Sequence, residues 1–219
     1  MRRLNARKLR LTAYHEAGHA IAAWIVGRTL LGRPKTGIGR VRIATAPEPI
    51  GNTGLGLFGM TEFGAFYPHE FLPAGGLQAN LVRAEDVRSW RLRLEAQLIV
   101  TLAGPLAEAR ISRRKGIAIS EHPGAFGDND MASSLLASFF GKDDPTNPEQ
   151  QMLWWGVDAG ASRIIRHPDA WAAIEALAIK LIEKGAATGH TISRIAKAKA
   201  GAAFPIARVA VEFGEELAT

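Results

Sequence analysis

Apolar residues recur at helical spacing in the N-terminal part of the chain. Between residues 12 and 26 they form a stripe with polar residues between them, as in a helix that buries one face. The stripe consists of Ala17, Ile21, Trp24 and Ile25. Thr12 suits the N-cap of such a helix, and Gly27 suits its C-terminal end. The pattern therefore predicts a helix over residues 12–26.

The next segments change to a pattern that is typical of strands. Residues 40–46 alternate apolar and basic side chains, which predicts a strand with one exposed face. Residues 54–66 are apolar but interrupted by glycine, and we expect them to pair with the first strand. Residues 67–80 are rich in proline and glycine and are expected to form a surface loop. A small β-sheet is therefore predicted.

Helical periodicity returns in the second half of the chain. It runs over residues 86–114, but Gly104-Pro105 should kink or restart the helix, so we expect two pieces. Residues 115–127 are expected to form a loop. Further helices are predicted over residues 129–140, 148–166 and 168–184.

These elements predict a mainly α fold with a small β-sheet, of the α+β class, in a chain of 219 residues. Residues 1–11 are expected to form a basic N-terminal arm, and residues 12–140 the core of the domain. Residues 141–147 (GKDDPTN) have the composition of a linker. Residues 148–219 are then the C-terminal helical part of the same domain.

Composition restricts the chemistry of the chain. With 47% hydrophobic and 22% charged residues, it is expected to form an ordinary packed core. The sequence has no cysteine, which excludes disulfides, thiolate zinc sites and cysteine nucleophiles. Any metal ion must therefore be bound by His, Asp or Glu.

The net charge of +6 comes largely from the first ten residues, which hold five basic side chains and no acidic one. No aromatic residue lies among them, so we expect a solvated segment and no nucleic-acid binding. The longest apolar run, residues 20–26, is much shorter than the roughly 20 residues that cross a bilayer. No secretory signal pattern is visible. We therefore expect a cytoplasmic protein without a membrane span.

The clearest chemical signal is His15-Glu16-Ala17-Gly18-His19, an HExxH motif inside the predicted helix. Residues four apart on a helix are about 40° apart, so both imidazoles can bind one metal ion. Glu16 lies beside them, where it can take a proton from the attacking water and return it to the leaving amine. Zinc suits imidazole ligands and leaves a position open for water. The motif therefore predicts a single-zinc peptidase site, and residues 12–140 are expected to form the zinc-binding catalytic core.

The motif alone leaves two points open. Two ordinary, partly buried histidines at this spacing would be the alternative to metal ligands. The longer motif with a third histidine is absent, because Ala22 and Ile25 stand where it requires Gly and His. The third ligand must therefore come from elsewhere in the chain.

Three strings of the chain resemble the protease domain of the FtsH family, the membrane-anchored AAA+ zinc metalloproteases. Residues 12–20 (TAYHEAGHA) are similar to the opening of that domain. Residues 92–110, which include LAGPLAEAR, are similar to the helix with the family's LGGRAAEE segment. Residues 127–137 (GDNDMASSLLA) resemble its GASNDLxxAT segment. A weaker similarity to the family's closing helices extends through residues 171–185 and Thr191-Ile192.

The resemblance implies a helical bundle around the HExxH helix and a set of site residues. Zinc would be bound by His15, His19 and the Asp of the family's Asn-Asp pair, which falls on Asp130. Asp128 is then expected to cap the following helix, whereas Asp130 considered alone would be a carboxylate that interacts with the helix dipole. Glu108 matches the first Glu of the family's AEE segment and is expected to orient one imidazole. Its alternative is a solvated helix glutamate.

Departures from the family change the expected function. The chain contains no Walker A sequence, so we expect no use of ATP to unfold a substrate. The interval between His19 and Asp130 is longer than in the family, and the additional residues are best placed in residues 27–35 and 67–80. We expect an ATP-independent zinc metallopeptidase that cuts flexible or unfolded polypeptides. The resemblance is also compatible with a homo-oligomer. The alternative is a non-catalytic zinc-containing adaptor or assembly module, which Glu16 disfavours because a structural zinc site needs no such carboxylate.

Overall fold

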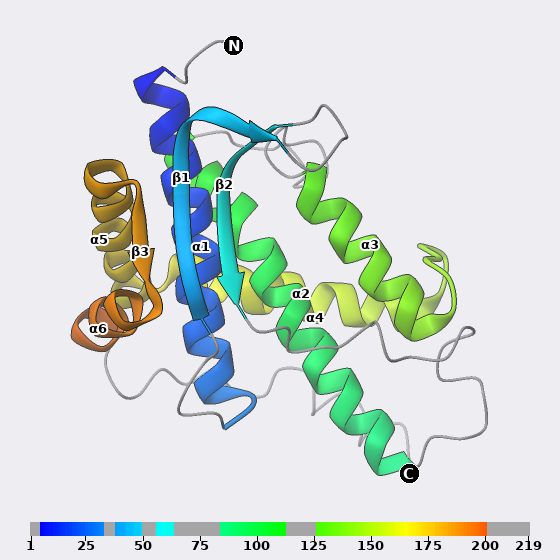
Figure 1. Cartoon of the computed structure of the whole chain (residues 1–219). Coiled ribbons are helices and arrows are strands. Elements are labelled where there is room, and N and C mark those ends of the chain that lie inside the picture. Colours follow the sequence, from blue (N-terminus) through cyan, green and yellow to red (C-terminus); the bar gives the residue numbers. More distant parts are fainter. Residues whose placement is uncertain (1–4, 33–37, 50–55, 64–83, 113–125, 201–219) are drawn as a thin grey trace.

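The computed structural model describes residues 5–32, 38–49, 56–63, 84–112 and 126–200. The helices are α1 (Ala6–Thr29), α2 (Ala84–Ser112), α3 (Phe126–Phe140), α4 (Pro148–Arg166), α5 (Pro168–Lys184) and α6 (Gly189–Ala200), and the strands are β1 (Ile38–Pro49), β2 (Gly56–Phe63) and β3 (Ala186–Thr188). Figure 1 shows β1 and β2 in front of α1, with α5, β3 and α6 on one side and α2, α3 and α4 on the other. Mainly helical structure with one small antiparallel sheet confirms the predicted α+β class.

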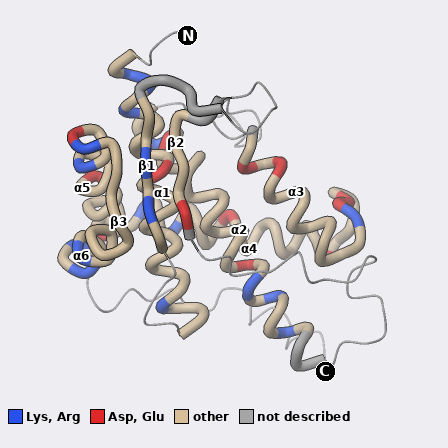
Figure 2. Tube along the Cα trace, in the orientation of Figure 1, with Lys and Arg blue, Asp and Glu red and all other residues tan. Residues whose placement is uncertain are grey.

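The helix that carries the HExxH motif is longer than predicted. The side chain of Asn5 caps α1 by accepting a hydrogen bond from a backbone N–H of the first turn at 2.9 Å. Leu9 packs against the core, and these two contacts explain why the helix begins before Thr12. Residues 6–11 of the predicted basic arm are therefore the first turns of α1, as the charges in Figure 2 show, and the helix continues through Gly27.

The sheet has the strand order β2-β1-β3, and neighbouring strands are antiparallel. β1 and β2 are the two predicted strands, and they pair as expected. β3 has three residues, too few for an alternating pattern to predict it. It forms because α5 ends at Gly185, whose φ of 73° favours glycine, and the chain then turns back along β1. Among the strands that the structure describes, β2 therefore lies at one edge of the sheet.

α2 is one continuous helix of 29 residues, so the expected division into two pieces is wrong. Pro105 lies inside the helix and cannot donate a backbone hydrogen bond there. The helix nevertheless continues, because its apolar face is held in the core by fully buried Leu94, Leu98 and Leu102. Tertiary packing thus outweighs the local effect of the proline.

The backbones of α1 and α2 come close together where the helices cross, at a glycine of α1. A Cβ at Gly18 would lie 2.6 Å from the carbonyl oxygen of Ala103 and 2.9 Å from the Cβ of Ala107. Such distances are too short for real Cβ contacts, so the helices can pack this closely only because residue 18 has no side chain. The crossing brings the HExxH segment directly against α2.

The C-terminal helices α4 and α5 have the predicted bounds, and each begins with a proline as expected. α4 packs on α2 and α5 packs on α1, so both contribute to the same apolar core. Residues 141–147 are tied to α4: the side chain of Gln150 donates to the carbonyl of Lys142 at 2.8 Å and accepts from the N–H of Asp144 at 2.9 Å. This segment is a folded connection rather than a free linker.

Several expected loops lie outside the described residues, including residues 67–80 and most of residues 115–127. Residues 201–219 lie outside them as well. In the part of the chain that the structure describes, none of the helices combines the length and the apolar composition needed to cross a bilayer.

Two glycines provide a matched test of the helix crossing. Gly18→Ala should lower the free energy of unfolding by about 1–3 kcal/mol, because the added Cβ must push α1 away from α2. Gly156→Ala in α4 should leave it unchanged or raise it by up to about 1 kcal/mol, because a Cβ there meets nothing within 4 Å. Urea denaturation of both variants measures the difference, and equal stability of Gly18→Ala and the wild type would contradict the close crossing.

Candidate metal centre

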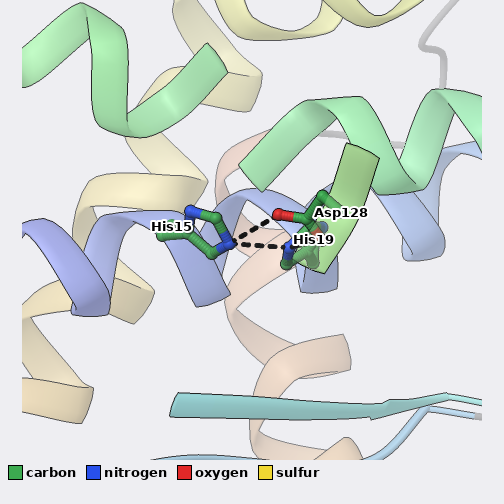
Figure 3. Close-up of side chains that lie close together, drawn as sticks. All are labelled: His15, His19 and Asp128. Carbon is green, nitrogen blue, oxygen red and sulfur yellow. Dashed lines mark hydrogen bonds and ion pairs between the residues drawn. The ribbon is translucent and has the colours of Figure 1, made fainter. Parts of the chain in front are cut away.

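α1 presents two imidazoles to one point in space. His15 and His19 lie one helical turn apart, and their Nε2 atoms are 3.1 Å from each other (Figure 3). The rings meet edge to face, with their centroids 4.7 Å apart. Their side chains are only 12% and 9% exposed, so the pair lies in the outer part of the core.

The outer nitrogens of both rings face groups on α2. His15 Nδ1 lies 3.2 Å from Oε2 of Glu108, and His19 Nδ1 lies 2.8 Å from the carbonyl oxygen of Val100. A carbonyl only accepts, so His19 Nδ1 donates, and the carboxylate of Glu108 favours the same arrangement in His15. The Nε2 lone pairs of neutral rings then point at one another. This arrangement requires a positive charge between them, either a proton or a metal ion.

Asp128, in the first turn of α3, adds a third group. Its Oδ2 lies 3.0 Å from Nε2 of His15, and its Oδ1 lies 3.3 Å from Nε2 of His19. Figure 3 shows the carboxylate directed at the two imidazoles. One ligand atom from each residue lies within 4.8 Å of the others, so the three side chains could hold a metal ion.

Asp128, and not the predicted Asp130, lies beside the two imidazoles in the structure. Asp130 is exposed and does not belong to the group of three side chains. α3 begins at Phe126, earlier than predicted, so Asp128 is inside the first turn and is not the N-cap. Residues two apart on a helix are about 200° apart, so only one of the two aspartates can face α1. The similarity between short strings could not determine which one.

Gly104 makes room for the ring of His19. A Cβ at this position would overlap Nε2 and Cε1 of the imidazole. The expected break at Gly104-Pro105 does not occur, because α2 is unbroken and passes directly beside the face of α1 that carries the two histidines. Any larger residue at 104 would have to displace the ring.

The pKa values of the clustered side chains indicate that the site favours a positive charge. Burial alone would lower the pKa of His15, but its hydrogen bonds to Asp128 and Glu108 raise that pKa to about 10. The pKa of His19 is also raised, because Asp128 outweighs the effect of burial. Burial would raise the pKa of Asp128, yet the two imidazoles hold it well below its usual range. Protons and a metal ion therefore compete for the same positions, and metal binding should weaken as the pH falls.

Glu16 is buried next to β2. Its side chain is 7% exposed, and Oε2 accepts a hydrogen bond from the Thr61 hydroxyl at 2.7 Å. A Cβ at Gly59 would lie only 2.6 Å from Glu16 Cγ, so the glycine allows β2 to pass directly over this side chain. Its negative charge contributes to the raised pKa of both His15 and His19.

No protein-family model matches the chain, and no curated protein is significantly similar to it in sequence. The chemistry of this centre must therefore follow from its own residues.

The two aspartates of α3 provide a test of the third ligand. Asp128→Ala should lose stoichiometric binding of a divalent transition metal after dialysis, because only two imidazoles remain. Asp130→Ala should retain it, because this exposed side chain lies outside the cluster. Metal content per chain, measured by atomic absorption, distinguishes them. The opposite result would return the ligand role to Asp130.

Glu108 should influence metal binding without being a ligand. Glu108→Gln keeps the size of the side chain but removes the charge that orients His15, so metal affinity should fall by about 10- to 100-fold. Competition with a chromophoric chelator measures the affinity. Unchanged affinity would mean that Glu108 is only a neighbour of the ring.

Proposed function

We propose that this chain is a zinc metallopeptidase that hydrolyses peptide bonds in flexible or unfolded polypeptides without ATP. One observation carries the proposal: His15, His19 and Asp128 converge on one point, and the buried residue Glu16 is next to His15 on the same helix. Metal ligands with a nearby carboxylate are what metal-assisted hydrolysis requires.

The spacing of the three groups supports zinc as the metal. Ligands about 2.0–2.1 Å from a tetrahedral zinc ion lie ~3.3 Å from one another. The Nε2 atoms of His15 and His19 are 3.1 Å apart, which is close to this spacing. Asp128 approaches them with different oxygens, Oδ2 at 3.0 Å from His15 and Oδ1 at 3.3 Å from His19, so the carboxylate would turn one oxygen toward a zinc ion. Three protein ligands would also leave a fourth position for water, as in other catalytic zinc sites.

Glu16 is the proposed general base. When bound, zinc polarises a carbonyl group and lowers the pKa of water to about 7. Glu16 accepts a proton from the attacking water and delivers it to the amine that leaves. Its burial at 7% exposure supports this role, because a carboxylate in a poorly solvated position interacts strongly with nearby charges.

The edge of the sheet supports a polypeptide as the substrate. Within the described chain β2 pairs with β1 on one side only, so its other edge presents backbone N–H and C=O groups. An extended peptide paired with that edge would pass close to Glu16, because Gly59 and Thr61 of β2 both adjoin its side chain. Backbone pairing selects extended segments with little preference for sequence. A tightly folded protein offers no such segment.

We place this peptidase with the FtsH-type enzymes on the three similar strings, residues 12–20, 92–110 and 127–137. Two histidines from one helix and an aspartate from a later helix support the placement. Asp128 in place of Asp130 is a departure from the alignment of these strings.

The alternative function is a non-catalytic zinc-containing adaptor or assembly module. Such a protein would keep the three metal ligands but would have no use for Glu16. Burial of a carboxylate costs free energy that a purely structural site avoids. The buried, hydrogen-bonded Glu16 therefore favours the enzyme.

Glu16→Gln separates the two functions. The variant keeps the size of the side chain but cannot accept the proton, so turnover of an unfolded protein such as reduced casein should fall by at least about 10²- to 10⁴-fold. Metal content and thermal unfolding should change little. The assay uses zinc-loaded protein without ATP and follows the release of new amino termini.

A folded, protease-resistant domain serves as the control substrate and should remain intact. If the zinc-loaded wild type cuts no unfolded substrate, or if Glu16→Gln cuts it equally fast, the peptidase proposal is wrong and the adaptor replaces it.

A further inference from the structure

One contact in the site has no role in the reaction as described above. The Thr61 hydroxyl on β2 lies 2.7 Å from Oε2 of Glu16 and 3.1 Å from the carbonyl oxygen of the same residue. The hydroxyl carries one hydrogen and can donate to only one of these acceptors at a time. The shorter distance and the charge of the carboxylate favour Oε2.

This hydrogen bond restricts the orientation of Glu16. Its carboxylate is buried, and a long glutamate side chain that is not held would occupy several rotamers. Thr61 holds Oε2, and Oε1 lies beside Gly59, where an added Cβ would be only 2.5 Å from it. One residue of β2 therefore holds one oxygen of the carboxylate, and another, by lacking a side chain, leaves room for the second oxygen.

On the basis of the proposed function, we propose that Thr61 is a positioning residue for the general base. It keeps Glu16 in the orientation needed to receive the proton from water, so that no reorientation is required during turnover. Thr61 also belongs to the edge strand that would pair with the substrate. The same strand therefore aligns the peptide and the base that acts on it.

Thr61→Val and Thr61→Ser test this role as a pair. Val keeps the branched shape that suits a strand but removes the hydroxyl, and Ser keeps the hydroxyl but removes the methyl group. With zinc-loaded protein and a fluorogenic unfolded substrate, Thr61→Val should lower kcat by about 10- to 100-fold, the effect of losing one hydrogen bond to a charged group. KM and zinc affinity should remain within about twofold, and Thr61→Ser should recover most of kcat.

Thr188→Val, on β3 across the sheet, is the matched control and should leave kcat unchanged. Wild-type turnover in Thr61→Val would overturn the role of Thr61 while leaving the peptidase proposal intact. Equal losses in Thr61→Val and Thr61→Ser would also overturn it, because shape rather than the hydroxyl would then matter. A zinc-loaded wild type without activity would overturn both proposals together.

Discussion

The candidate site depends on the close crossing of α1 and α2. Gly18 lets the two backbones approach, and this approach places Glu108 and Val100 opposite the outer nitrogens of the two histidines. The ring of His19 in turn fits only because residue 104 is a glycine. A wider separation of the helices would remove the partners of both imidazoles at once. The orientation of the ligands is thus a result of helix packing rather than of the motif alone.

The cluster buries ionisable groups at positions where apolar side chains would make the folded protein more stable. His15, His19, Asp128, Glu108 and Glu16 are all largely withdrawn from water. Three carboxylates near two imidazoles carry excess negative charge if the rings are neutral. Burial of unbalanced charge is expensive, and a divalent cation is an efficient way to compensate for it. Such a concentration of buried ionisable groups is characteristic of functional sites.

Sequence patterns predicted the parts of the structure that depend on local spacing. Periodicity gave the bounds of α4 and α5, and the HExxH motif identified the face of α1 that carries the two imidazoles. The early start of α1 escaped prediction because the N-cap Asn5 acts together with the tertiary contact of Leu9, which the sequence pattern does not show. The unbroken path of α2 through Pro105 likewise depends on packing. The aspartate that lies beside the imidazoles, Asp128, could not be told from Asp130 in the sequence, because two aspartates in one short string differ only in the face of the helix they occupy.

The three side chains that could hold a metal come from helices at distant points in the chain. Roughly 110 residues of chain separate His19 from Asp128. Bringing together two residues this far apart in the chain carries a substantial entropic cost. An ion shared by both residues would act as a removable cross-link between α1 and α3. At a free concentration 100 times its dissociation constant, a bound ion stabilises the state that binds it by about 2.7 kcal/mol. Binding of the ion and packing of the first turn of α3 against α1 would then be coupled. A lower supply of metal would therefore weaken this packing.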